Sequence, residues 1–331
     1  RSSNMLVTVI IFSYNNLKYL RQAIDSVLMQ DYEQIQLIVS DDGSAHFDLQ
    51  AVRQYIERKK RDNIKEYLVR TNGRNLGTVR HVNRALFHMH GAYLVNLAAD
   101  DVLYDAQVIS NYVRYYAQVK DPDTLVLTQV QHYSQDMREK LYDVLTPERI
   151  RLLEYGSMPQ IYGELCQWCF IPEAGTALPA ELIHRLGGFD ERYDLVEDWP
   201  FFLKAVRQGV KFRYFDTVSE KHRNGGVSHS SRKRGTKTQN RYYKDLLRVN
   251  RYEILKYYRL APENLQKKIY TMAKDRLVIY ECRNMFWNKS AAEKTRWLLN
   301  NPNLPMVLAR GIKRKIIRGF YERCLKRDYL Q

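Results

Sequence analysis

The chain has 331 residues, of which 45% are apolar, enough for two domains or for one large domain with an appendage. Its net charge of +16 is uneven: residues 1–225 carry 27 Lys and Arg against 29 Asp and Glu, whereas residues 226–331 carry 26 against 8. Four cysteines are too few for a disulfide framework, and we find neither a signal-peptide pattern nor an apolar run of membrane-spanning length. We therefore expect a protein of a reducing compartment whose C-terminal part meets an anionic partner.

Four apolar segments in the first hundred residues are predicted to be strands, and helical periodicity separates them. The strands are expected at 6–12, 35–39, 67–69 and 93–99, and the helices at 17–28, 49–56 and 78–90. Alternation of strands and helices at this spacing predicts an α/β fold with a Rossmann-type, mostly parallel sheet flanked by helices.

A polar loop follows each of these strands, at 13–16, 40–44, 72–77 and 100–101. Ligands of open α/β sheets bind just beyond the carboxyl ends of the strands. Acidic pairs end two of the strands, Asp41 with Asp42 and Asp100 with Asp101. Because neighbouring carboxylates repel, this edge is predicted to hold a divalent cation together with phosphate oxygens.

The next segment, up to residue 225, contains a β-branched run at 124–130 that predicts a strand. Gly175, Thr176 and Ala177 then lead into a helix expected at 180–186. Gly-Gly-Phe-Asp-Glu follows at 187–191, and Val-Glu-Asp-Trp at 196–199 opens a further helix that runs to about Gln208.

Together these segments resemble the family 2 glycosyltransferases of GT-A fold over roughly the first 225 residues. The motifs are Ser-Tyr-Asn at 13–15, Asp-Asp-Gly-Ser at 41–44, Asn75 with Gly77 and Asn83, Asp-Asp at 100–101, Gly-Gly-Phe-Asp-Glu and Glu-Asp-Trp. Two positions depart from the family pattern, since Phe12 stands where Pro is usual and Ala98 where the first Asp of Asp-x-Asp is usual.

The resemblance implies a nucleotide-sugar site with Mn²⁺ or Mg²⁺ as cofactor. Its expected donor-binding residues are Ser13, Tyr14, Asn15, Asp41, Asp42, Asn75, Gly77, Asn83 and Asp100. Its expected metal ligands are Asp100, Asp101 and His222, with Asp100 as the main ligand because Ala98 lacks a carboxylate. His222, Arg223 and His229 lie in a segment that in the family often closes over the diphosphate.

A general base is expected at Asp198, beside Glu197, at the start of a helix whose dipole would keep a carboxylate ionised. The alternative is that one of these two residues only caps the helix. Trp199 is expected to provide an apolar floor for the acceptor sugar, with Gly175 and Thr176 beside the acceptor. One base that faces a separate anomeric carbon implies a single displacement and hence inversion.

Residues 230–331 are predicted to be helical and basic. In the last segment Leu308, Ile312, Ile316 and Phe320 recur at every fourth position, with basic residues between them. Such a helix is typical of an anionic membrane surface. A helical bundle with a solvated basic rim and an oligomerisation surface are the alternatives.

The sequence therefore predicts three parts: a nucleotide-sugar-binding half at 1–105, an acceptor-binding and catalytic half at 106–229, and the helical basic region at 230–331. The expected function is that of an inverting glycosyltransferase on the cytoplasmic face of a membrane. It would move a sugar, expected from a UDP-sugar, to a hydroxyl of a glycan or lipid-linked acceptor in surface polysaccharide synthesis. A nucleotidyltransferase would usually have a glycine-rich loop at 13–16, which contains no glycine. A nucleic-acid-binding protein would not place acidic residues at the sheet edge, so no nucleic-acid partner is expected.

Overall fold

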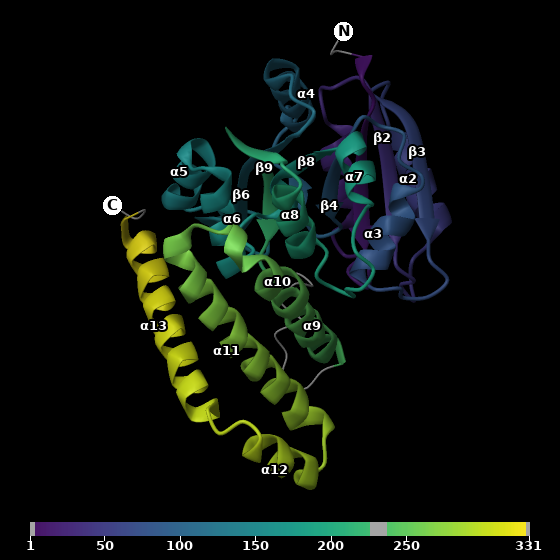
Figure 1. Cartoon of the computed structure of the whole chain (residues 1–331). Helices are drawn as coiled ribbons and strands as arrows, with labels where there is room; N and C mark the ends of the chain where they lie inside the picture. Colours follow the sequence, from purple (N-terminus) through teal and green to yellow (C-terminus); the bar gives the residue numbers. More distant parts are fainter. Residues whose placement is uncertain (1–3, 226–236, 329–331) are drawn as a thin grey trace. The chain divides into compact units, whose positions relative to one another are not determined.

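The computed structural model in Figure 1 describes residues 4–225 and 237–328, and their side chains except at 237, 285–288 and 318–328. The chain divides into two compact units. Unit 1 contains residues 1–158 and 169–229, and unit 2 contains residues 159–168 and 230–331. One sheet runs through both 1–105 and 106–229, so these two ranges share a single unit.

Unit 1 is built on a nine-stranded sheet with the order β3-β2-β1-β4-β8-β6-β9-β5, and β7 pairs with β6 outside this path. The strands are β1 Val7–Ser13, β2 Ile35–Asp41, β3 Ile64–Thr71, β4 Tyr93–Ala98, β5 Val102–Leu103, β6 Thr124–Tyr133, β7 Lys140–Asp143, β8 Thr176–Pro179 and β9 Lys211–Arg223.

The four strands predicted in the first hundred residues are present and lie side by side in parallel. Ser13 pairs with Asp41, Asp41 pairs with Thr71, and Phe12 pairs with Ala98. The register therefore brings the four strand ends, and the polar loops that follow them, to one edge of the sheet. Both faces of β1 and β2 are buried, as their continuous apolar sequence predicts.

The second half of the sheet is mixed. β8 is antiparallel to both β4 and β6, β9 is parallel to β6, and β5 is antiparallel to β9. β8 and β5 are too short to produce a periodic pattern, so neither strand could be predicted from the sequence. β9 has 13 residues but was not predicted either. Buried and exposed positions alternate only in its first half, so the whole segment shows no continuous strand pattern.

The helices of unit 1 pack on this sheet through apolar positions at helical spacing, such as Leu20, Ile24 and Val27 of the first one. They are α1 Leu20–Leu28, α2 Leu49–Lys59, α3 Thr78–Leu86, α4 Val108–Val119, α5 Pro147–Tyr155, α7 Ala180–Leu186 and α8 Asp198–Arg207, with the 3₁₀ turn η2 Glu173–Gly175.

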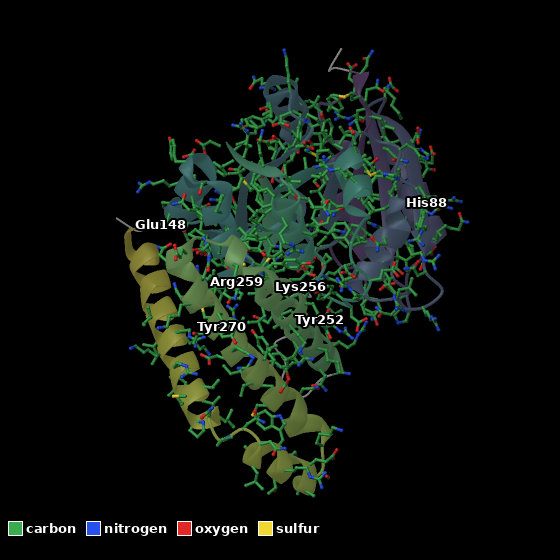
Figure 2. All side chains as sticks on the ribbon, viewed as in Figure 1. His88, Glu148, Tyr252, Lys256, Arg259 and Tyr270 are labelled. Carbon is green, nitrogen blue, oxygen red and sulfur yellow. The ribbon has the colours of Figure 1, made fainter. Side chains whose placement is uncertain are left out.

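Unit 2 is helical. Besides most of α6 Met158–Gln167 it contains α9 Lys237–Arg248, the π-helical turn η4 Val249–Ile254, α10 Leu255–Tyr257, the 3₁₀ turn η5 Tyr258–Leu260, α11 Glu263–Asn288, α12 Ala291–Leu299 and α13 Leu304–Asp328. Buried apolar residues such as Leu246, Ile269 and Met272 form its core. Exposed aromatic and basic side chains, among them those labelled in Figure 2 at Tyr252, Lys256, Arg259 and Tyr270, lie outside this core. Among the described helices, none combines the length and the apolar character that crossing a bilayer requires.

Candidate functional site

The strand β4 ends in the turn that carries Asp100 and Asp101, and both residues are buried. Burial is the main reason why the pKa of Asp100 is raised above its usual value, and the neighbouring charge of Asp101 raises it further. A hydrogen bond with the side chain of Asn16 acts in the opposite direction. Two adjacent carboxyl groups are thus held out of water at the predicted edge of the sheet.

The strand β9 brings two further ionisable groups to this turn. Because β5 pairs with β9, Leu103 lies opposite Glu220 and Val102 lies opposite Lys221. The imidazole Nδ1 of His222 is 2.8 Å from the carboxylate Oδ2 of Asp101. One ligand atom from each of Asp101, Glu220 and His222 lies within 4.8 Å of the others.

The donor atoms of this cluster suit a divalent cation. Two carboxylates and an imidazole are ligands that Mn²⁺ accepts, and carboxylates alone suit Mg²⁺. Both carboxylate oxygens of Glu220 are buried, no N–H or hydroxyl of the described residues donates to them, and the side chain that Glu220 meets is the carboxyl group of Asp101. Burial, with the charge of Asp101 next, raises the pKa of Glu220 well above its usual value. A buried carboxylate without a donor is costly, and a cation between Asp101, Glu220 and His222 would remove that cost.

The structure brings together two of the three expected metal ligands and adds one that was not expected. Asp101 and His222 belong to the cluster, whereas Asp100, expected as the main ligand, does not. Glu220 was not predicted. His222 belongs to the strand β9 and is half-buried. His229 lies outside the described residues.

Arg223, at the end of β9, holds the acidic turn in place. Its backbone N–H donates to Asp101 Oδ1 at 2.7 Å, and its Nε donates to the carbonyl oxygen of Asp100 at 2.8 Å. The two Nη atoms donate to Gln135 and Gln22, and the guanidinium stacks on the ring of Tyr19. With each of its three guanidinium nitrogens engaged in this way, Arg223 orients the acidic turn instead of offering the phosphate contact considered from the sequence.

Asp41 is fully buried at the end of β2, and its carboxylate is saturated with local hydrogen bonds. Oδ1 accepts from the hydroxyls of Ser13 and Ser44, and Oδ2 accepts from the backbone N–H of Ser44 and the hydroxyl of Thr71. These four bonds occupy the lone pairs that Asp41, expected among the donor-binding residues, would need to accept an N–H of a nucleotide base. In this structure Asp41 organises the loop.

Asp42 plays the same part for the loop at 72–77. Its carboxylate accepts hydrogen bonds from the side-chain amides of Asn72 and Asn75 and from the backbone N–H groups of Leu76 and Gly77. Gly77 has a φ of 87°, a conformation that favours glycine, and it directly precedes α3. The predicted motif residues are thus brought together, with Asp42 as the anchor.

The loop after β1 presents an aromatic ring at the same edge. Tyr14, one of the expected donor-binding residues, is 40% exposed, so a nucleotide base could stack on its ring. Asn15 has a φ of 53°, and its backbone N–H donates to the hydroxyl of Ser44 at 2.7 Å. The loops after β1 and β2 are therefore linked directly.

Asn83 lies on α3 and contacts a different motif. Its side-chain amide donates to the carbonyl oxygen of Phe189 at 2.7 Å and accepts from the N–H of Phe189 at 3.0 Å. A Cβ on Gly188, whose φ is 72°, would lie 3.1 Å from the amide oxygen of Asn83. Asn83 thus fixes the Gly-Gly-Phe segment across 106 positions of sequence, which accounts for its residue type without a nucleotide contact.

Asp198 is the first residue of α8, as predicted, and Glu197 occupies the N-cap position without a side-chain capping bond. The carboxylate of Asp198 accepts from the N–H of Trp199 at 2.7 Å and from the thiol of Cys169 at 3.5 Å. Burial of the carboxyl group nevertheless raises the pKa of Asp198. Desolvation outweighs the hydrogen bonds that lower the pKa of this carboxyl group.

Glu173 is a half-buried acidic residue that was not predicted from the sequence. Its side chain accepts a hydrogen bond from the amide of Asn96, the polar residue that interrupts the apolar run of β4. Burial raises the pKa of Glu173 to about 7; the bond from Asn96 lowers this pKa and the charge of Asp198 raises it. Asn96 was the available signal, since a buried amide in a strand requires a polar partner.

The expected acceptor residues lie in the interior. Trp199 is only 6% exposed, which argues against an apolar floor for a sugar. The hydroxyl of Thr176 donates to the carbonyl oxygen of Glu173. A Cβ on Gly175 would lie 2.8 Å from the carbonyl oxygen of Thr128, so this glycine permits close packing between η2 and β6. Trp199, Thr176 and Gly175 therefore contribute to packing in the interior of unit 1.

Comparison with known sequences agrees with these motifs. The model of the family described as "Glycosyl transferase family 2" matches residues 8–165. An uncharacterised glycosyltransferase of Rickettsia prowazekii is 30% identical over 213 residues, which are 64% of this chain and 61% of the relative. One from Rickettsia felis is 28% identical over 205 residues, 61% of this chain and 31% of the relative. The chain thus spans less than two thirds of these curated relatives.

Solved structures share the fold. Residues 1–349 of Staphylococcus aureus TarS, in complex with UDP-GlcNAc, superpose with a TM-score of 0.57 at 18% identity, covering 92% of this chain and 81% of that one. The mannosyltransferase PcManGT of Pyrobaculum calidifontis, in complex with GDP-Man and Mn²⁺, gives a TM-score of 0.55 at 19% identity, with 99% and 85% covered. The expected α/β architecture with a C-terminal helical region is confirmed.

Proposed function

The chain belongs to glycosyl transferase family 2 through residues 8–165, and on this premise we propose that it transfers a sugar from a UDP-sugar to a hydroxyl of a glycan or lipid-linked acceptor. The observation that carries the proposal is the convergence of Asp101, Glu220 and His222 after β4, at the edge of the sheet to which β1, β2 and β3 also bring their polar loops. A solved neighbour that binds UDP-GlcNAc and another that binds GDP-Man with Mn²⁺ support a nucleotide-sugar donor.

In this proposal, Asp101, Glu220 and His222 hold a divalent cation, Mn²⁺ or Mg²⁺. When bound, such a cation would offset the charge of the departing diphosphate as a Lewis acid. Arg223 keeps the acidic turn oriented towards it through bonds to Asp100 and Asp101. The ring of Tyr14 stacks on the base, while Asp41 and Asp42 keep the surrounding loops in the shape that admits it.

Asp198 is proposed as the general base that takes the proton of the acceptor hydroxyl. Its raised pKa supports this role, because a carboxylate with a higher proton affinity is a better base at neutral pH. Glu173 and Asp198 influence each other's protonation, so the protonated state of Glu173 favours an ionised Asp198. A single base and a single displacement give inversion at the anomeric carbon. We also propose that the reaction takes place on the cytoplasmic face of a membrane, in surface polysaccharide synthesis.

Calorimetry of UDP binding, with and without Mn²⁺, tests the donor site. The wild type should bind UDP more tightly with Mn²⁺ and more tightly than GDP. Asp101→Asn and His222→Ala should lose the gain due to Mn²⁺, and Asp101→Asn should lose more of it than Asp100→Asn. His184→Ala, which removes an exposed histidine of α7, serves as the control. Equal metal dependence in all variants would refute the proposed cluster.

Transfer itself is tested with a panel of nucleotide sugars and a lipid-linked acceptor. Asp198→Asn should keep donor binding but lower the transfer rate by about 10²- to 10⁴-fold, the range for a general base. The anomeric configuration of the product, measured by NMR, should be opposite to that of the donor. Retention would exclude the single displacement, and full activity of Asp198→Asn would exclude this residue as the base.

A further inference from the structure

The helix α13 has two apolar faces, and only one of them is covered within unit 2. Leu304 and Val307 are buried. A Cβ on Gly311 would lie 3.2 Å from the side chain of Ile279, so α13 approaches α11 closely along this face. The two helices run side by side in Figure 1.

Ion pairs fix the rotation of α13 about its own axis. Arg310 donates to the buried carboxylate of Asp275 on α11 through Nε at 3.0 Å and Nη2 at 2.7 Å, and Arg314 donates to the same carboxylate. Two of the basic residues that stand between the apolar positions of α13 are therefore paired within unit 2. The pairs hold the packed face against α11, and the remaining face is held outward.

The outward face carries the apolar positions that recur at every fourth residue. Leu308, Ile312 and Ile316 are 41%, 60% and 62% exposed and follow one another at steps of about 40° around the helix. At about 100° per residue, Ile312 lies about 140° around the helix from the buried Val307. Single exposed apolar residues are ordinary, but a continuous row of them on one helix marks an interaction surface. We call Leu308, Ile312 and Ile316 the α13 stripe.

Two lysines border the α13 stripe. Lys315 lies about 60° to one side of Ile312 and Lys313 about 100° to the other, and both are exposed. Long lysine side chains can lie along apolar surface and extend their ammonium groups into an anionic headgroup layer. The net positive charge of residues 226–331, which carry 26 Lys and Arg against 8 Asp and Glu, also favours an anionic surface.

We propose that the α13 stripe lies on an anionic lipid surface, with Ile312 and Ile316 inserted among the acyl chains and Lys313 and Lys315 at the headgroups. This is the arrangement of an interfacial amphipathic helix. The inference rests on the proposed function in one respect: membrane binding would hold the enzyme where a lipid-linked acceptor is found. Binding itself requires neither donor nor acceptor.

A second copy of the chain is a poorer occupant. Two copies that met through the α13 stripe would bring their bordering lysines close together, and both C-terminal regions carry a large positive charge. Stable interfaces bury about 1,200 to 2,000 Å² in total, more than three aliphatic side chains on each partner supply. The stripe also lacks the tyrosine, tryptophan and arginine anchors that dominate protein interfaces.

Vesicle flotation of the full chain tests the proposal. The vesicles are phosphatidylcholine with one third phosphatidylglycerol, or phosphatidylcholine alone, at about 0.1 M and about 1 M salt. The wild type should float with the anionic vesicles at the lower salt only. Ile312→Glu/Ile316→Glu should bind at least tenfold more weakly. Phe87→Glu/Leu299→Glu changes the charge equally at two other exposed apolar positions and should bind like the wild type.

The lysines provide an independent arm that leaves the apolar side chains intact. Lys313→Gln/Lys315→Gln should weaken binding about fivefold for each lysine, from about 1 kcal/mol each near an anionic leaflet. Lys60→Gln/Lys65→Gln, two exposed lysines of unit 1, is the matched control. Failure of the wild type to float, or equal flotation of all variants, overturns the proposal. If light scattering instead finds a dimer that Ile312→Glu/Ile316→Glu dissociates, the stripe belongs to a second copy. A loss of transfer with vesicle binding intact would count against the proposed function alone.

Discussion

Glu173→Gln should make the stability of unit 1 less dependent on pH. Burial is the main reason why the pKa of Glu173 is about 7 in the fold, against an ordinary value of 4.5. Because the folded pKa lies above the unfolded one, the stabilisation is complete below about pH 4.5 and is lost as the pH rises through about 7. Glutamine cannot ionise, and its carbonyl oxygen can still accept the hydrogen bond from Asn96.

The size of the effect follows from the two pKa values. Each pKa step corresponds to about 1.36 kcal/mol, so the difference between 4.5 and about 7 amounts to about 3 kcal/mol. At pH 8 we therefore expect Glu173→Gln to unfold with a free energy up to about 3 kcal/mol higher than the wild type. Near pH 5 the two proteins should differ little, because both then carry a neutral side chain at this position.

Urea denaturation from pH 5 to pH 8, in the presence of a chelator so that no cation alters the local charge, measures this difference. Glu181→Gln is the matched control, since Glu181 is an exposed residue of α7. Its stability should follow that of the wild type at every pH. The reasoning is refuted if Glu173→Gln gains no stability between pH 5 and pH 8 relative to this control, because Glu173 would then not be held neutral by burial.

Three further predictions concern other buried groups. Asp41→Ala should lower the free energy of unfolding by about 3 kcal/mol as well as weaken UDP binding, because it leaves buried hydroxyl and N–H donors without their acceptor; unchanged stability in urea would contradict the saturated carboxylate. Cys169→Ala should move the acidic limb of the pH profile of kcat/KM to higher pH, because it removes a donor that lowers the pKa of Asp198. Cys169→Ser, a stronger donor, should move this limb to lower pH, and identical profiles would exclude the contact. Asp275→Asn should destabilise unit 2 by about 2 kcal/mol and make α13 more sensitive to limited proteolysis, because Arg310 and Arg314 lose their charged partner. If α13 of the variant resists proteolysis as it does in the wild type, these ion pairs do not hold α13 in place.

The first four strands and their edge could be predicted from local pattern. Runs such as 6–12 and 35–39 are apolar on both faces, and each ends abruptly in polar residues, so burial and strand ends are both visible in the sequence. The helix α8 and the position of Asp198 at its start were also predictable, because the apolar spacing begins directly after the Glu-Asp pair. These features depend on neighbours in the chain.

The partners of the site residues could not be predicted in this way. Glu220 and His222 meet Asp101 only because β9 pairs with the two-residue strand β5, across more than a hundred positions of sequence. Asn83 contacts Phe189 over a similar separation. Such pairings are decided by the order of strands in the sheet, which no local periodicity encodes.

The helix α13 shows the same division within one element. Its apolar residues at every fourth position and its basic residues were evident from the sequence, and they predicted a helix with one apolar side. The sequence by itself could not tell that a second face, with Val307 and Gly311, packs on α11, or that Asp275 engages Arg310 and Arg314. Periodicity reports that a residue can be buried, but which of two apolar faces is covered depends on the long-range contacts that only the tertiary structure brings about.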